Sequence, residues 1–185
     1  MYSKNCTKQW RENMLYAYLR ERMKDFDLFP MDWLKSTDFF TAPSSTRYHA
    51  AYEGGLFDHS VNVACMLHLW TNKGVARDWE REDSPFIIGI LHDATKIGLY
   101  IEDGTNRWVH NPDYVQIGSC HGEDSLIKVS NQVDLTAEEA QCIRWHMGAY
   151  EGPESWEGYD AAIKRYPNVL FTHTADMFAS KLMER

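Results

Sequence analysis

The segment "IIGILHDATKIG" (residues 87–98) has the composition of a buried helix, but three polar residues interrupt it. His92, Asp93 and Lys96 place an imidazole, a carboxylate and an ammonium among apolar side chains. An isolated ionised carboxylate in apolar surroundings is strongly destabilising unless it has a partner. We therefore expect Asp93 to bind a metal ion or to pair with a cation. A helix-end ion pair between His92 and Asp93 is the simpler alternative.

The residues just before this segment are typical of a helix start. Ser84 is a suitable N-cap, and Pro85 can occupy the first helical position, where its missing N–H costs nothing. Residues 86–91 leave almost no polar face. This helix is therefore expected to lie in the centre of the protein with most of its sides covered.

The whole chain has the composition of one soluble globular domain. It has 185 residues, of which 44% are hydrophobic and 25% are charged. No apolar run reaches the roughly 18 residues that a membrane span needs, and the N-terminus lacks the apolar core of a signal peptide. The four cysteines form no CxxC pair and are expected to be reduced thiols. We expect a cytoplasmic protein that does not enter a membrane.

The net charge limits the class of ligand. Lysine and arginine total 19 while aspartate and glutamate total 27, which gives a formal net charge of −8. Such a surface repels phosphate backbones, so long nucleic acid is disfavoured as a partner. A small phosphorylated substrate remains compatible, because bound divalent cations reverse the sign of the field inside a cleft.

Helical spacing recurs along the rest of the chain, and strand signals are confined to one short region. Asp103-Gly104 supplies a hairpin turn, and Thr136 with Glu139 forms a capping-box pattern. We expect helices over about 7–26, 56–70, from His121 onward, over 135–148 and after Pro167, a hairpin over 100–110, and a loop over 151–160. The predicted fold is all-α with one small β-hairpin, in a single domain over 1–185.

Further polar residues that can bind a metal fall on or beside these helices. They are His59, His121, His146, His173 and Asp176. Helices packed in a bundle can direct such side chains to one interior point. Imidazole and carboxylate together suit Zn²⁺, Mn²⁺ or Fe²⁺. If Asp93 bridged two ions, it would hold them about 3.5–4 Å apart, a spacing that suits phosphoryl chemistry.

The order of these residues resembles the HD-domain superfamily, whose signature is His … His-Asp … Asp. Here the signature reads His59, His92-Asp93 and Asp176. "YHAAYEGGLFDHSVNV" (48–63) and "LHDATK" (91–96) are similar to segments of HD-type exoribonucleases. "HGEDSL" (121–126), "CIRWHMG" (142–148) and "LFTHTADMFASK" (170–181) are similar to small HD hydrolases of bacteria and their phages. The resemblance covers residues 48–181.

The resemblance implies an HD-type helical bundle with a metal-dependent phosphohydrolase site. The metal-binding core would span 48–181, after an N-terminal helix and lead-in loop over 1–47. The implied ligands of a first ion are His59, His92, Asp93 and Asp176, and those of a second ion are His121 and His146, with Asp93 bridging. One or two divalent ions are implied, drawn from Mn, Fe, Zn, Ni and Co, with Mg as an alternative.

One position departs from the family pattern. Several relatives have His-His-Gly where this chain has His146-Met147-Gly148. A methionine thioether does not replace a ligand for a hard cation. The number of ions therefore stays open between one and two.

Three residues besides the implied ligands are candidates for roles in the reaction. Lys96 follows Asp93 by three residues and could hold a phosphate oxygen, or it could form a surface ion pair. His173 could protonate the leaving group or orient a ligand, or it could be a packed helix residue. Arg144 could bind phosphate or face solvent. The candidate catalytic residues are thus Asp93, Lys96 and His173, and the candidate substrate-binding residues are Lys96 and Arg144.

Three functions are consistent with these residues. The first is hydrolysis of a phosphate ester of a nucleotide or a related small molecule by a metal-activated water, as in a phosphodiesterase or nucleotidase. The second is a di-iron oxygenase, because a few HD-fold proteins use the same ligand set for O₂ chemistry. The third is a non-catalytic module that binds a metal or a nucleotide.

Overall fold

The structure of this chain is a computed structural model that describes residues 3–105 and 107–184. Within these residues it contains eight α-helices and one two-stranded antiparallel sheet, so the all-α prediction with a small hairpin is confirmed. The helices are α1 (Lys8–Arg22), α2 (Met31–Ser36), α3 (Gly55–Asn72), α4 (Ser84–Leu91), α5 (His121–Ser130), α6 (Ala137–Trp145), α7 (Trp156–Arg165) and α8 (Asn168–Phe178), and the strands are β1 (Tyr100–Glu102) and β2 (Trp108–His110).

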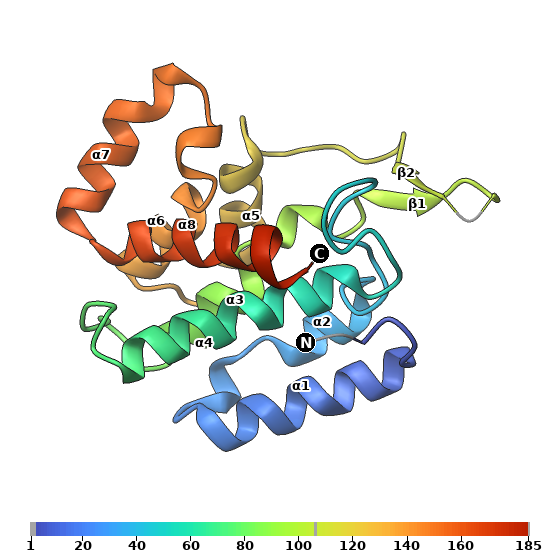
Figure 1. The fold of residues 1–185 in the computed structure, drawn as a ribbon, viewed down its shortest axis with the longest axis horizontal. Helices are drawn as coiled ribbons and strands as arrows, with labels where there is room; N and C mark the ends of the chain where they lie inside the picture. Colours follow the sequence, from blue (N-terminus) through green and yellow to red (C-terminus); the bar gives the residue numbers. More distant parts are fainter. Residues whose placement is uncertain (1–2, 106, 185) are drawn as a thin grey trace.

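Helix α3 runs through the middle of the molecule, with α4 packed against it (Figure 1). Helices α1 and α2 lie on one side of this pair, and α6, α7 and α8 lie on the other. One apolar cluster joins α1 and α2 to the central pair and includes Leu19, Phe40 and Phe57. A second cluster, which includes Val63 and Val169, joins the central pair to α6 and α8. The two central helices are therefore covered on both sides.

The contact between α3 and α4 depends on a glycine. A Cβ atom at Gly89 would lie 2.3 Å from the Cα of Ala64, so a larger residue would push the helices apart. His59 precedes Ala64 on α3, and His92 follows Gly89 at the end of α4. Both histidines therefore lie at the same end of the helix pair. The rings of His59 and His92 are 5.2 Å apart there. Close packing of the two helices thus brings His59 and His92 together at one edge of a histidine cluster that also includes His121 and His146.

The apolar segment is not one continuous helix. Asp83, rather than Ser84, is the N-cap of α4, and Pro85 lies in its first turn. Helix α4 ends at Leu91 with His92 as its C-cap, and Asp93 then precedes a 3₁₀ turn over Ala94–Lys96. The polar residues of the segment therefore lie where the helix stops.

Most of the other predicted elements are confirmed with shifted boundaries. The expected helix over 7–26 is α1, which begins after its N-cap Thr7 and ends at Arg22. The hairpin pairs Tyr100 with His110. The capping box of Thr136 and Glu139 is present at the start of α6.

The expected loop over 151–160 is wrong in its second half. Helix α7 begins at Trp156, directly after a short 3₁₀ turn over Pro153–Ser155. Gly158 favoured a loop in the sequence, but it instead lies against the ring of Trp145, where a Cβ atom would be only 2.8 Å away. Tyr159 and Ile163 of α7 pack against the second apolar cluster, so burial stabilises a helix that local composition disfavours.

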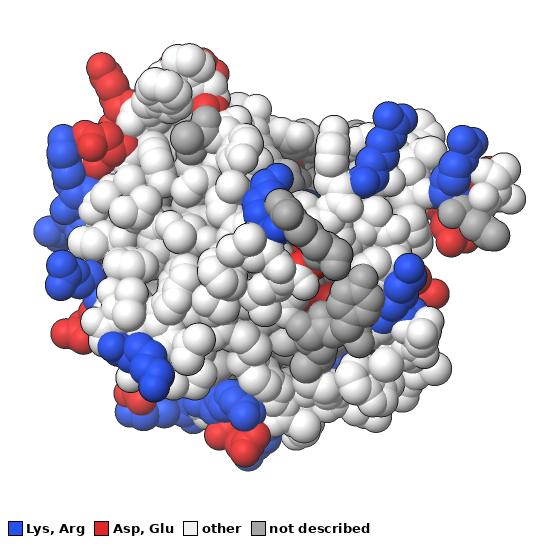
Figure 2. Space-filling view, viewed as in Figure 1, with Lys and Arg blue, Asp and Glu red and all other residues white. Residues whose placement is uncertain are grey.

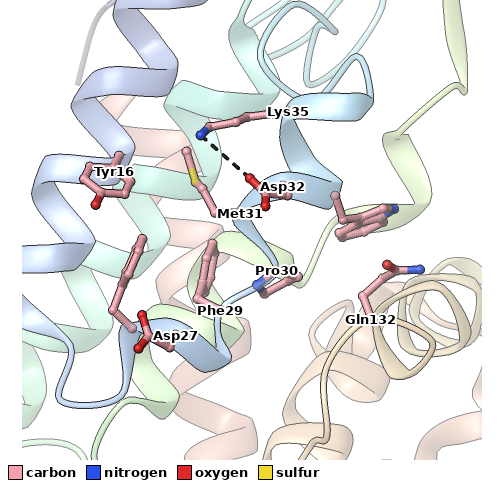
Figure 3. Close-up of a pocket in the computed structure, with 10 residues that line it drawn as sticks. Tyr16, Asp27, Phe29, Pro30, Met31, Asp32, Lys35 and Gln132 are labelled. Carbon is pink, nitrogen blue, oxygen red and sulfur yellow. Dashed lines mark ion pairs between the residues drawn. The ribbon is translucent and has the colours of Figure 1, made fainter.

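Two further surface features are separate from the histidine cluster. A cavity of about 480 Å³ lies beside α1 and α2, with Tyr16, Phe29 and the ion pair of Lys35 and Asp32 in its wall, and no histidine lines it (Figure 3). On the face drawn in Figure 2, acidic and basic side chains are interspersed around the rim of the molecule. Among the described residues, none of the helices combines the length and the apolar character needed to cross a bilayer.

Candidate metal centre

The first half of the site gathers side chains from three distant parts of the chain. His59 comes from α3, His92 from the end of α4 and Asp176 from α8. The Nε2 atom of His59 lies 3.3 Å from Nε2 of His92 and 3.2 Å from Oδ1 of Asp176. Oδ2 of Asp93 lies 3.4 Å from the same His59 atom. Donor atoms of His59, His92 and Asp176 all lie within 4.8 Å of one another, which is close enough to hold one ion.

The second half adjoins the first through Asp93. His121 is the first residue of α5, and His146 is the C-cap of α6. Oδ1 of Asp93 lies 2.6 Å from Nε2 of His121 and 3.5 Å from Nε2 of His146. Donor atoms of Asp93, His121 and His146 likewise all lie within 4.8 Å of one another. Since Oδ2 of Asp93 faces the first half, one carboxylate lies between two groups of nitrogen ligands.

The two C-cap histidines are oriented by the helices that they end. Nδ1 of His92 lies 3.0 Å from the carbonyl oxygen of Gly89, and Nδ1 of His146 lies 2.7 Å from that of Ile143. Carbonyls in the last turn of a helix have no intrahelical partner and can accept such bonds. Because a carbonyl only accepts, Nδ1 carries the proton, and Nε2 keeps a lone pair directed at the site.

The cluster fits a divalent metal ion. Nε2 of His146 is buried and makes no hydrogen bond among the described residues. A buried polar atom without a partner is destabilising, and an ion would satisfy it. Imidazole nitrogen and carboxylate oxygen are the ligands that transition metals such as Zn, Mn and Fe accept. The buried histidine and carboxylate groups could therefore hold a metal ion.

The pKa values of His59 and Asp93 are shifted so that their opposite charges balance each other. Burial alone would lower the pKa of His59, but its hydrogen bonds to Asp176, Asp93 and Glu184 raise it well above the ordinary 6.5. Burial likewise opposes charge on Asp93, but Lys96 and the neighbouring histidines hold its pKa well below the ordinary 3.8. When no metal ion is bound, the positive charge of protonated His59 thus balances the negative charge of the nearby carboxylates. A bound metal ion would take over this role, and the proton would leave.

A cavity of about 200 Å³ opens onto both halves of the cluster. It is lined by His49, Asp93, Lys96, His121, Met147, Tyr150, Asp176, Met177, Ser180 and Lys181. Nζ of Lys96 lies 2.5 Å from Oδ2 of Asp93 and 3.1 Å from Oγ of Ser44, so Lys96 is a buried cation at the site rather than half of a surface ion pair. Its burial would lower its pKa, but the Asp93 carboxylate raises it, and the amine stays charged.

The structure does not bring two candidates into this cavity. Arg144 is held by Glu151 at 2.8 Å and by Glu123 at 3.3 Å, so its guanidinium is already engaged by carboxylates. His173 lies behind the second half, where its Nδ1 is 2.8 Å from the carbonyl oxygen of His146. From there it can position His146 but does not line the cavity.

The structure also adds residues that the sequence analysis did not select. His49 lines the cavity, and its Nε2 is 3.1 Å from Oγ of Ser44. Lys181 is a second lysine in the cavity wall. Glu184 contacts Nδ1 of His59 at 3.1 Å. The signal for His49 is its place in the "YHAAYEGG" stretch, whereas nothing in the local sequence marks Glu184.

The protein-family models, the curated proteins and the solved structures that were compared contain no match to this chain. What the fold and the cluster define is a helical protein with buried histidine and carboxylate groups compatible with an HD-type metal site.

Proposed function

We propose that this protein is a metal-dependent phosphohydrolase of the HD type, which cleaves a phosphate ester of a nucleotide or a related small molecule. The observation that carries the proposal is the position of Asp93. Its carboxylate lies between two groups of histidines, as a carboxylate shared by two ions would. Paired ions stabilise both the attacking and the leaving oxygen of a phosphoryl transfer.

The residues of the site divide into metal ligands and a residue that would contact the substrate. His59, His92, Asp93 and Asp176 would hold one ion, and Asp93, His121 and His146 would hold the other. When bound, divalent ions supply a water of lowered pKa and neutralise charge on phosphate oxygens. Lys96, whose ammonium already binds one carboxylate oxygen, would exchange that contact in part for a phosphate oxygen.

The size and lining of the cavity favour a small phosphate ester. Its volume of about 200 Å³ is below the roughly 300–1,000 Å³ of sites that enclose a whole ligand. It would admit the phosphate and the atoms next to it, and the remainder of the substrate would lie outside. The two lysines in its wall, Lys96 and Lys181, favour an anionic substrate over O₂.

The test is a screen of purified Mn²⁺-loaded protein against mono-, di-, tri- and cyclic nucleotides, with metal content measured on the same sample. We expect release of inorganic phosphate or of a nucleoside monophosphate from at least one class. Bound nucleotide without turnover would indicate a non-catalytic module. In a second sample loaded with iron instead of Mn²⁺, a di-iron signal by Mössbauer spectroscopy, with O₂ consumption and no hydrolysis, would indicate an oxygenase.

A further inference from the structure

The carboxylate of Glu184 is buried against the first half of the centre. Its oxygens lie 3.1 and 3.2 Å from Nδ1 of His59, and only 7% of the residue is exposed. Nδ2 of Asn62 donates to Oε1 of Glu184 at 3.1 Å. Asn62 follows His59 by three residues and so lies on the same face of α3. Glu184 is therefore held by two side chains of one helix.

His59 needs this contact because of its place in its helix. His92 and His146 are C-caps, and each donates to a carbonyl oxygen of its own last helical turn. His59 lies near the beginning of α3, where the preceding carbonyls are bonded within the helix. No free backbone acceptor of α3 is available to its Nδ1. An acceptor from elsewhere in the chain must orient the ring, and Glu184 is that acceptor.

Glu184 could instead be a metal ligand, since His49, His59 and Glu184 also group within 4.8 Å. An ion there would require Nδ1 of His59, while Nε2 of the same ring faces Asp176 and Asp93. A neutral imidazole has only one nitrogen without a proton. The geometry of the ring therefore assigns Nδ1 to the Glu184 hydrogen bond and Nε2 to the metal centre.

We propose that Glu184 is a positioning residue for this centre. It accepts a hydrogen bond from Nδ1–H of His59 and so directs Nε2 of that ring toward Asp176 and Asp93. Through this contact, metal binding is coupled to the ordering of residues 179–184 against the centre. This inference rests on the metal centre of the proposed function but not on its reaction. Carboxylates that accept the second N–H of a ligating histidine raise metal affinity in the same way.

The segment that carries Glu184 is also part of the cavity wall. A π-helix over Ala179–Met183 continues α8, and its residues Ser180 and Lys181 line the cavity. Single π turns within α-helices are frequently found at functional sites. Since a coupling between two binding events is reciprocal, metal binding should hold the segment in place as strongly as the segment holds the metal.

The first experiment measures Mn²⁺ affinity by titration calorimetry without any substrate. Glu184→Ala should lower the affinity of one site about 10–100-fold. Glu184→Gln should lose less, because the amide oxygen still accepts. Asp160→Asn, which changes an exposed carboxylate on α7, is the matched control and should bind as the wild type does. Unchanged affinity in Glu184→Ala would overturn the proposal.

The second experiment measures hydrogen exchange of residues 179–184 with and without Mn²⁺. In the wild type, Mn²⁺ should slow this exchange, and in Glu184→Ala it should slow it much less. Equal protection in both proteins would overturn the coupling, and so would no protection in either. A wild-type protein that shows these effects but hydrolyses no phosphate ester would overturn the proposed function alone.

Discussion

Asp93 and His121 face each other with Oδ1 and Nε2 only 2.6 Å apart, while the other oxygen of the same carboxylate faces His59. This contact joins Asp93, the residue just before the 3₁₀ turn that follows α4, to the first residue of α5. Asp93 therefore contacts histidines of both adjoining groups, His121 through one carboxylate oxygen and His59 through the other. The behaviour of Asp93 variants is therefore the most direct test of the site.

Asp93→Ala should remove both metal-binding groups at once. It should also destabilise the metal-free protein by about 3–5 kcal/mol, because Lys96 would remain buried without its counter-ion. Elemental analysis after loading with Mn²⁺ checks the first effect, and urea unfolding of chelator-treated protein checks the second. Adding Lys96→Met should recover much of the lost stability but none of the metal. Two retained ions in Asp93→Ala would disprove the shared-ligand arrangement.

Lys96→Met should separate phosphate binding from metal binding. The variant loses the ammonium in the cavity but none of the histidine or carboxylate ligands, so metal content should stay the same or rise. On whichever phosphate ester the nucleotide screen identifies, turnover should fall about 10²–10³-fold, as when one donor to a transition-state oxyanion is removed. Steady-state kinetics and metal analysis on one preparation provide the measurement. Loss of metal instead would mean that Lys96 maintains the ligand geometry.

Arg11→Met should test how the loop that bears His49 is held. Arg11 is fully buried and donates to the carbonyl oxygens of Ser3, Phe40 and Glu53 at 2.9–3.1 Å. Each buried acceptor left without a donor costs about 1–3 kcal/mol, so the three carbonyl oxygens together predict a loss of at least about 3 kcal/mol in the free energy of unfolding. Urea denaturation measures it.

The control for Arg11 is Arg22→Met, which removes a partly exposed arginine paired with its neighbour Glu21. This change should alter stability by less than about 1 kcal/mol. If both variants were equally stable, the buried guanidinium would not be what holds the loop.

The elements predicted correctly from the sequence are those in which the hydrophobic periodicity and the capping residues indicate the same helix. Helix α3 and the capping box of α6 follow directly from local residues. Helix α7 was missed because glycine and proline, here Gly158 and Pro153, are typical of loops. Only the packing of Gly158 against Trp145 shows why a glycine is there. Contacts between helices that are distant in the sequence cannot be recognised from a short stretch of residues. The role of a glycine such as Gly158 is therefore clear only from the structure.

The same distinction applies to the candidate site. The six proposed ligands could be selected because their order resembles the HD signature and because histidine and aspartate are costly to bury without a partner, and they fall in two adjoining groups. Glu184 could not be selected, because glutamate near other polar residues is ordinary and its partner His59 is 125 positions away. Arg144 was selected for its charge, but its two glutamate partners could not be foreseen.

The metal-free protein should lose stability in acid through Asp124. Burial alone would raise the pKa of Asp124, but hydrogen bonds from Tyr114, Thr95 and the backbone N–H of Ile117 lower it to about 2, below the ordinary 3.8. A lowered pKa contributes stability that is fully present above about pH 4 and is lost as the pH falls toward 2. Urea unfolding at pH 7, 4 and 2.5 in the presence of a chelator measures this.

Asp124→Asn isolates the contribution of that carboxylate. The variant should be less stable than the wild type at pH 7, and the difference should shrink as the pH falls through 3. Asp160→Asn on the exposed surface of α7 should show no such convergence. A constant difference between Asp124→Asn and the wild type at every pH would mean that shape, rather than charge, determines its effect.

Met147→His should strengthen binding at the second half of the centre. Met147 follows His146 and lines the cavity together with Asp93 and His121, so an imidazole there would add a nitrogen donor beside two existing ligands. We expect the weaker of two Mn²⁺ affinities to rise at least about tenfold, or a second ion to bind where the wild type holds one. Titration calorimetry gives both affinity and stoichiometry. Met147→Leu keeps the volume without a donor and should match the wild type, and an equal gain in both variants would show that packing, not ligation, limits the second ion.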